Sequence, residues 1–270
     1  MKRVLKQLEP IELTRFRNAV PQGTWQQMRD DANFGGPAAS NACRAHLLAD
    51  QGGICGFCEI AIHDNDPLKC RVEHFHPKSD ISLAHNWALD WNNQLGVCAG
   101  GSHKSSSVPY TQEPLAQNLS CDAYKDRMIQ SGRLPAQCEG WILNPIELIA
   151  TPCLFQVEKS TGKLLPDPAN CAVSPPWPGN QHVDVCTLAQ YTIDMLNLNC
   201  DRLCQARITI VRDIEHNKKR QRDKGFSAQQ GLSNLATFYL RQCWPGFFTT
   251  IRICLGAAAE AHLANIAFQG

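Results

Sequence analysis

Two cysteines two residues apart, Cys55 and Cys58 in ICGFCE, open the segment that is richest in residues able to do chemistry. A lone pair with this spacing has three interpretations: half of a metal site, a redox pair, or two buried thiols in a turn. The redox interpretation requires a strand-to-helix setting within a βαβ unit, and the turn-rich segment after the pair does not supply one. A zinc site requires four ligands at tetrahedral corners, so further ligands must come from downstream.

Candidates for those ligands lie between residues 70 and 121. Cys98, in NNQLGVCAGG, and Cys121, in LSCDAYKD, have neighbours that suit a metal site. His103, in GGSHK, is an alternative fourth ligand, whereas Cys70 falls in an apparent strand. The residue types favour zinc, because thiolate and imidazole are the ligands of zinc sites.

An acid stands beside a histidine in VEHFHPKS, residues 72–79. Glu73 could hold a divalent cation while the neutral imidazole of His74 takes a proton from water. The alternative is a surface histidine in a turn bounded by Pro77. The side chain of Asn93 could fix the loop that carries His74 by bonding to backbone groups. Asp122 adds an oxygen ligand farther along the chain.

Three further residues are weak candidates for binding a substrate phosphate. His76 would share a strand face with His74, although an exposed turn residue is the simpler interpretation. Lys78 follows it, and Lys125 ends the CDAYK motif. The run HNKKRQRDK, residues 216–224, could also bind nucleic acid, and a solvated helix end is the alternative.

The composition excludes several classes of protein. The chain has 270 residues, 43% of them hydrophobic, which is enough for a sizeable core, and a net charge of only +1 excludes a wholly basic surface. The first residues lack the apolar segment of a secretory signal, and no uncharged apolar run reaches about 18 residues. We therefore expect a cytoplasmic protein without a membrane partner. In a reducing compartment its fourteen cysteines are thiols or metal ligands rather than disulfides.

The pattern of the chain predicts an α+β fold in three parts. Residues 1–50 form an N-terminal arm, strand-like to about residue 20, and then a helix over 38–50; residues 51–140 form the metal-rich core; residues 141–270 form a mainly helical lobe. Within that lobe, short strands are expected at 154–158 and 163–165 around a Thr161-Gly162 turn. From about residue 185 the spacing of apolar residues is helical, with the last helix over about 249–267.

The order of these motifs resembles that of HNH endonucleases over residues 55–125. The chain carries a CxxC pair, an acid-His-x-x-Pro motif, an Asn-x-x-x-x-Cys motif and Cys-Asp-x-x-Lys, in that order. The second cysteine pair departs from the usual CxxC, because Cys98 and Cys121 are separated by a Gly/Ser loop. Flanking motifs, among them ILNPIE and TIDMLNLNCDRL, are similar to those of the HNH subunit of the Septu phage-defence system and its retron-associated relatives.

The resemblance implies a ββα-metal nuclease core and a role for each matching residue. His74 would be the general base, Asn93 would orient the histidine loop, and Glu73 with Asp122 would hold catalytic Mg²⁺ or Mn²⁺. A structural Zn²⁺ would be held by four thiolates: Cys55, Cys58, Cys98 and Cys121. The implied partners are nucleic acid, either DNA or RNA, and an SMC- or ABC-like ATPase subunit. The alternative function is a zinc-stabilised module that binds nucleic acid without cutting it.

Overall fold

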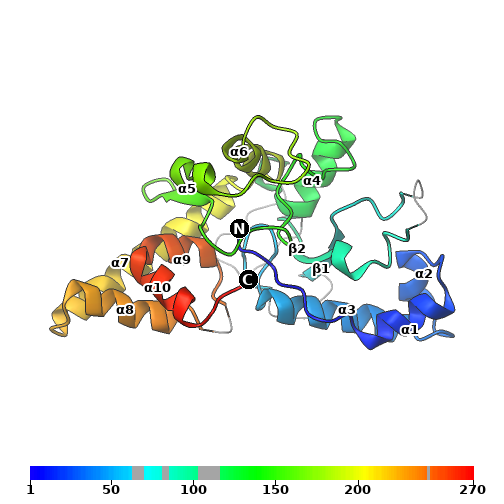
Figure 1. Ribbon diagram of the computed structural model, residues 1–270, viewed down its shortest axis with the longest axis horizontal. Helices are drawn as coiled ribbons and strands as arrows, with labels where there is room; N and C mark the ends of the chain where they lie inside the picture. The colour runs from blue at the N-terminus through cyan, green and yellow to red at the C-terminus, as the bar shows by residue number, and fades with distance from the viewer. Residues whose placement is uncertain (63–69, 81–84, 103–115, 242–243) are drawn as a thin grey trace.

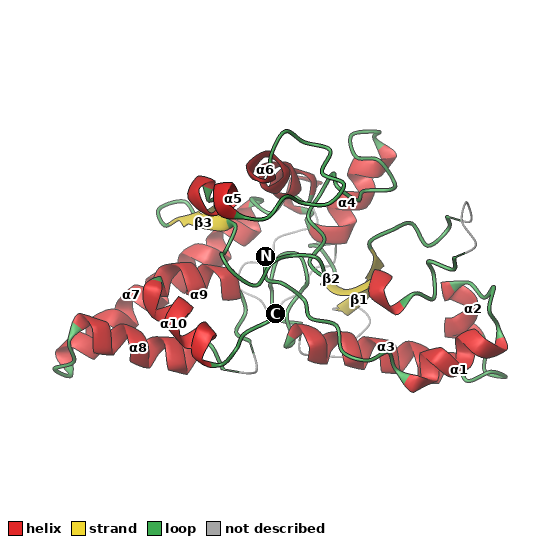
Figure 2. Ribbon diagram, in the orientation of Figure 1, coloured by secondary structure: helices red, strands yellow, loops and turns green. Residues whose placement is uncertain are grey.

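The computed structural model describes residues 1–62, 70–80, 85–102, 116–241 and 244–270. Helices dominate these residues, and two small antiparallel sheets lie among them (Figures 1 and 2). This mixture confirms the α+β fold class.

Three helices form the N-terminal part: α1 (Ile11–Ala19), α2 (Trp25–Asp30) and α3 (Gly36–Gln51). In Figure 1, α1 and α3 lie below the first sheet and α2 lies to its right. The expected arm is therefore partly wrong, because a helix begins directly after Pro10. Helix α3 agrees with the predicted helix and ends where Gly52 adopts a left-handed conformation with φ 67°. The side chain of Trp91 reaches the small core that these helices share.

The first sheet is a hairpin of β1 (Cys70–His74) and β2 (Gln94–Cys98). Its register sets Cys70 opposite Cys98 and His74 opposite Gln94. A long connection joins the strands and ends in the short 3₁₀ helix η1 (Trp91–Asn93). After a second 3₁₀ turn, η2 (Ala116–Asn118), the chain enters α4 (Cys121–Gln130), which packs on β2. A hairpin followed by a helix at Cys121 is the predicted order of elements.

The C-terminal part begins with the second sheet and continues as a set of helices. Its elements are β3 (Phe155–Glu158), β4 (Lys163–Pro166), α5 (Pro168–Val173), α6 (Val185–Met195), α7 (Asp201–Asp223), α8 (Ala228–Tyr239), α9 (Phe248–Leu255) and α10 (Ala257–Asn265). Both predicted strands are present. The predicted single helix over 249–267 is wrong, because the chain turns sharply at Gly256, where φ is 55°.

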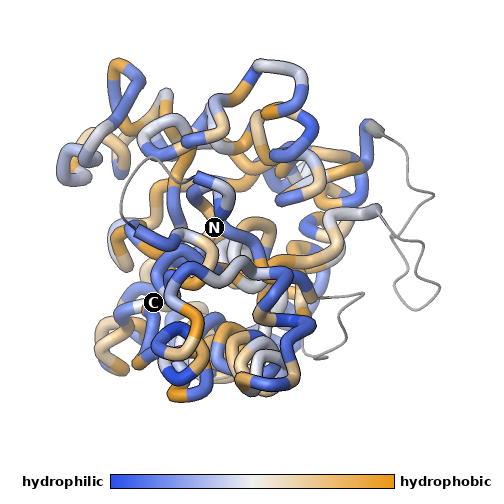
Figure 3. The backbone as a smooth tube through the Cα atoms, turned by 90° about the vertical axis from the view of Figure 1, so that its right-hand side faces the viewer, coloured by the Kyte–Doolittle hydropathy of each residue, from blue (hydrophilic) through white to orange (hydrophobic). Residues whose placement is uncertain are grey.

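One hydrophobic cluster runs through all three parts of the chain, with Val4, Phe57, Leu203 and Leu263 among its buried members. In Figure 3 hydrophobic and hydrophilic stretches alternate along the helices, as expected for elements with one face in a core. Among the described residues, no helix combines the length and the apolar character needed to cross a membrane.

Candidate metal centre and active site

Four buried thiols meet within residues 51–140: those of Cys55, Cys58, Cys98 and Cys121, whose sulfurs all lie within 4.8 Å of one another. The sulfur of Cys55 lies 3.8 Å from that of Cys121, and the sulfur of Cys98 lies 3.6 Å from Cys58 and 3.7 Å from Cys121. A zinc ion about 2.3 Å from each corner of a tetrahedron would place its sulfurs roughly 3.8 Å apart. The donor set and its spacing therefore fit a structural zinc ion.

Three separate elements bring these thiols together. The side chain of Gln51, at the end of α3, donates to the carbonyl of Ile54 at 2.8 Å and exchanges two hydrogen bonds with Gly96 of β2. It thereby ties the loop of Cys55 to the strand that ends at Cys98. Cys121 opens α4 in a left-handed conformation, φ 56°, which non-glycine residues adopt only when their surroundings hold them there.

The turn after Cys98 requires glycine. Gly100 has φ 62°, and a Cβ atom at this position would lie 2.3 Å from the carbonyl oxygen of Ser120. The same turn directs the N–H of Gly100 to the sulfur of Cys98 at 3.4 Å, while the N–H of Cys98 points to the sulfur of Cys55 at 3.3 Å. Such N–H groups stabilise thiolates, which are the form that binds metal.

The pKa values of the thiols differ within the cluster. Burial raises the pKa of Cys58 and of Cys121 well above its ordinary value, whereas hydrogen bonds from the other three thiols outweigh burial at Cys55 and hold its pKa well below. Arg202, from α7, lies beside the cluster, and its guanidinium donates to the hydroxyl of Ser120 at 2.6 Å. Four thiolates around one Zn²⁺ carry a net charge of −2, which the buried guanidinium offsets in part.

Two carboxylates, Glu73 and Asp122, lie on the side of the hairpin that faces α4, each beside a cationic side chain. Oε1 of Glu73 accepts a hydrogen bond from the ammonium of Lys125 at 2.6 Å, and Oδ2 of Asp122 lies 3.7 Å from a guanidinium nitrogen of Arg71. Burial, and then the charge of Glu73, raise the pKa of Asp122 to about 7. A divalent cation would relieve this repulsion, and carboxylate oxygens are the ligands that Mg²⁺ and Mn²⁺ prefer.

Lys125 does not fit its predicted role as a phosphate contact. Its side chain is 3% exposed, and its ammonium also donates to the carbonyl of Phe75 at 3.1 Å. Although burial favours the neutral amine, the charge of Glu73 holds the pKa of Lys125 above its ordinary value. The lysine therefore neutralises Glu73 from inside the protein.

His74 is buried on the opposite face of β1 from Glu73, as the alternation of side chains along a strand requires. Its ring stands edge-on to Trp25 of α2, with the two ring centroids 4.9 Å apart, and Nε2 lies 3.0 Å from the carbonyl oxygen of Ala88. A carbonyl only accepts, so Nε2 carries the proton and Nδ1 is the basic nitrogen. Burial lowers the pKa of His74 to about 4, which keeps the ring neutral near pH 7.

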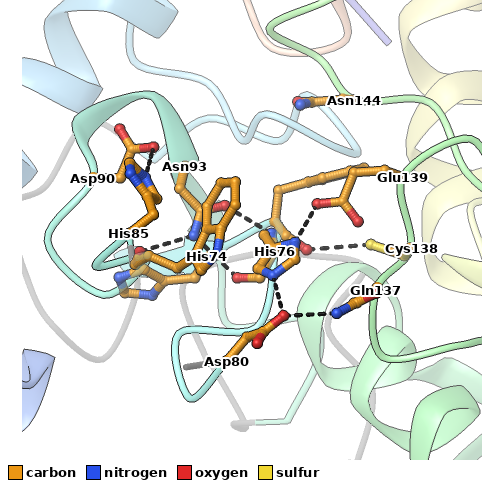
Figure 4. A network of polar contacts seen from close by, with 12 residues as sticks. His74, His76, Asp80, His85, Asp90, Asn93, Gln137, Cys138, Glu139 and Asn144 are labelled. Atoms are coloured by element: carbon orange, nitrogen blue, oxygen red, sulfur yellow. Dashed lines mark hydrogen bonds and ion pairs between the residues drawn. The ribbon is translucent and has the colours of Figure 1, made fainter. Parts of the chain in front are cut away.

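Asn93 clamps the main chain that follows His74 (Figure 4). Its Oδ1 accepts from the N–H of His76 at 2.7 Å, and its Nδ2 donates to the carbonyls of His76 at 3.0 Å and Trp87 at 2.9 Å. The two ends of the long connection between β1 and β2 are thereby held together, so the position of Asn93 suits the predicted orienting role.

His76 is neither the exposed turn residue nor the phosphate contact that the sequence favoured. Its ring is stacked on Trp87 at 4.0 Å between centroids, and its two nitrogens lie 2.7 Å from Glu139 and 2.8 Å from Asp80 (Figure 4). Asp80 also accepts from Gln137 at 2.6 Å. Both ring nitrogens contact carboxylates, so the imidazole joins the loop after β1 to residues 137–139.

Lys78 is exposed and lines a cleft of about 750 Å³ between α2, α3 and β1, which leaves it available to a substrate. His103 lies outside the described residues. Arg202, Trp25 and Glu139 could not be identified from the sequence, since each acts through a contact with a distant segment. Only the burial of a charged residue in a helix could have drawn attention to Arg202.

No protein-family model matches the chain. A comparison with curated proteins finds an Escherichia coli protein named "Retron Ec83 putative HNH endonuclease". It is 33% identical over 254 residues, which make up 93% of this chain and 92% of the relative. The similarity thus extends over all three parts of the chain. The chain belongs to the family of HNH-type endonucleases.

Proposed function

We propose that the chain is a metal-dependent endonuclease whose hairpin β1–β2 and helix α4 form a ββα-metal core that hydrolyses phosphodiester bonds. The observation that carries this proposal is the placement of Glu73, on the hairpin, and Asp122, in the first turn of the helix, near enough for the charge of Glu73 to add to burial in raising the pKa of Asp122 to about 7. Lys125 pairs with Glu73 and Arg71 lies beside Asp122, so a catalytic cation would compete with these two cations for the carboxylate oxygens.

The residues divide the work between them. Glu73 and Asp122 would hold Mg²⁺ or Mn²⁺, which would neutralise the charge that develops on the phosphate. His74, neutral and protonated at Nε2, offers Nδ1 as the base; because it faces away from the carboxylates, the attacking water must lie at the end of β1, between the two faces. Asn93 fixes the loop that follows His74, and Lys125 orients the carboxylate of Glu73.

The thiol cluster has a different role. Four thiolates fill the coordination sphere of zinc and leave no open position for water or substrate, so this site is structural. It joins the loop after α3 and the end of β2, the strand that pairs with the Glu73 strand, to the start of α4, which carries Asp122. Zinc would therefore support catalysis by fixing the geometry of a second metal site.

We further propose that the chain is the effector nuclease of an antiphage defence complex in the cytoplasm. The name of the relative associates that protein with a retron, and the motifs of the chain resemble the HNH subunit of Septu. The partner implied by this resemblance is an SMC- or ABC-like ATPase. Co-purification of the chain with the product of its genomic neighbour tests this part of the proposal.

Cleavage assays test the nuclease proposal. The chain, alone and with its ATPase, is incubated with plasmid DNA and with RNA in Mg²⁺ or Mn²⁺. His74→Ala and Asp122→Asn are expected to lower the cleavage rate by at least a hundredfold, since each removes a group that acts on the reacting phosphate. His216→Ala and Asp213→Asn, at exposed positions of α7, are the matched controls.

Two outcomes would contradict the proposal. Cleavage that survives His74→Ala would point to another base. Tight binding of nucleic acid by a zinc-loaded chain that cuts neither DNA nor RNA would favour the alternative, a binding module without catalysis.

A further inference from the structure

A cleft of about 750 Å³ lies between the N-terminal helices and the hairpin. Helix α2 contributes Trp25 and Arg29, α3 contributes Arg44, and β1 contributes Arg71 and Val72. These two helices are not part of the hairpin and helix that carry the candidate active site. The cleft is therefore a feature that the N-terminal part of the chain adds to the nuclease core.

Positive charge dominates the cleft. Four cationic side chains line it: Arg29, Arg44, Arg71 and Lys78. Asp30 is the carboxylate among the lining residues. The chain as a whole has a net charge of only +1, so this local excess is not a consequence of its composition. Clustered arginines and lysines on one surface are the electrostatic mark of a phosphate-binding site.

Arg44 supplies an independent indication of a ligand. Its Nε is buried and has no hydrogen-bond partner, although one terminal nitrogen donates to Asn41 at 2.5 Å. A buried donor without a partner is unfavourable, so native proteins satisfy nearly all such groups. An anionic oxygen bound in the cleft would supply the missing acceptor.

The cleft also adjoins both halves of the candidate active site. Arg71 lines it and extends its guanidinium to within 3.7 Å of Asp122. Trp25 and Ala88 line it as well, and these two residues contact the ring of His74. Glu73, His74 and Asp122 do not line the cleft themselves, so a strand bound there would reach them past Arg71, Trp25 and Ala88.

We propose that the cleft binds a single strand of nucleic acid next to the bond that is cut, with phosphates held by Arg29, Arg44 and Lys78. This inference rests on the proposed nuclease function. The volume lies within the range of small-molecule pockets, which suits about two nucleotides of one strand and is too small for a double helix. Apolar walls at Trp25 and Val72 are suited to the bases, whose contacts with such surfaces tolerate any sequence.

Binding measurements test the inference independently of cleavage. Fluorescence anisotropy records the affinity of the full chain, in Ca²⁺ without Mg²⁺, for labelled single-stranded DNA and RNA and for a duplex. The triple variant Arg29→Ala, Arg44→Ala, Lys78→Ala is expected to bind single strands at least tenfold more weakly. Its slope of log affinity against log salt should fall by roughly 2, because three phosphate contacts are lost.

The matched control removes the same number of cations from the basic run of α7, as Lys219→Ala, Arg220→Ala, Arg222→Ala, which are exposed positions. It should bind as the wild type does. Equal loss in both triple variants, loss in the control alone, or equal affinity of the wild type for duplex and single strand would overturn the inference. If the wild type binds single strands through the cleft and cuts neither DNA nor RNA, the nuclease proposal fails and the binding site stands.

Discussion

The ammonium of Lys125 and the carboxylate of Glu73 form a buried ion pair at 2.6 Å, between the first turns of α4 and the end of β1. The lysine side chain is 3% exposed and that of the glutamate is 13% exposed. In the absence of water, each charge depends on the other. The same lysine donates to the carbonyl of Phe75, so it also fixes the end of the strand.

Lys125→Met should destabilise the chain by about 3–5 kcal/mol, because it leaves Glu73 buried without its partner and close to Asp122. Urea unfolding measures this change. The double variant Lys125→Met, Glu73→Gln removes the orphaned charge and should recover more than half of the loss. A double variant as unstable as the single one would show that packing, and not charge, is what the lysine provides.

The thiol cluster predicts about one zinc ion per chain. Cys58→Ser should reduce the zinc content of the purified protein to a small fraction of that value and lower its melting temperature, since the ion joins three elements of the core. Metal analysis and thermal unfolding measure the two effects. Cys43→Ala, which alters a buried thiol in the separate core of the N-terminal helices, is the control and should retain its zinc.

Arg202→Met should weaken zinc retention by roughly ten- to a hundredfold, because groups that hold the neighbours of metal ligands tune the affinity of a metal site. Competition with a chromophoric chelator measures this. The control is Arg212→Met, at an exposed position of the same helix. Unchanged zinc affinity in a stable, folded Arg202→Met would refute a role for this guanidinium at the cluster.

Asn93→Ala should lower the free energy of unfolding by about 2–4 kcal/mol, because it leaves backbone groups of His76 and Trp87 without their hydrogen-bond partners. Asn92→Ala is the control, since Asn92 is exposed. Urea unfolding at neutral pH compares the two variants. Equal losses in both would show that the clamp adds nothing to the stability of the loop.

The pKa of His74 predicts a loss of stability in mild acid. It is about 4 in the folded chain, because of burial, against about 6.5 in an unfolded one. Between these values the unfolded chain binds more protons, so stability is lost as the pH falls below about 6.5. Between pH 7.5 and pH 5.5 the free energy of unfolding of the wild type should fall by about 1 kcal/mol more than that of His74→Gln. A constant difference would mean that His74 is not buried as a neutral ring.

The sequence predicted the residues whose chemistry depends on their own type and spacing, and it failed where distant segments decide. Cys55, Cys58, Cys98 and Cys121 could be named as one set because the order of motifs resembles that of HNH endonucleases, whereas residue types alone left His103 as an alternative ligand. Glu73, beside His74 in the VEHF segment, could be placed in a strand from the local pattern. Burial of His76 could not be predicted, because it depends on Glu139, which lies 63 residues away. The pairing of Lys125 with Glu73 could not be predicted for the same reason, because nothing near Lys125 in the sequence indicates this carboxylate.

Two errors in the helices have local causes. Residues 1–9 have no regular secondary structure, and α1 begins after Pro10 without a side-chain cap, so Glu12 in its first turn is a weak signal of the start. The predicted helix over 249–267 contains Gly256, whose conformation at φ 55° separates α9 from α10. Glycine within an apolar helical pattern can continue the helix at modest cost, so the break could not be inferred from residue type alone.

The segment that carries Cys121 is attached to the C-terminal lobe along its main chain. Cys121 donates its N–H to the carbonyl of Leu196, and the amide of Asn197 donates to the carbonyls of Gln117 and Leu119. A fragment truncated near residue 140 would therefore lose these attachments together with Arg202. The nuclease core and the lobe cannot be exchanged as independent modules, and attempts to graft this active site onto another scaffold must carry α6 and the start of α7 with it.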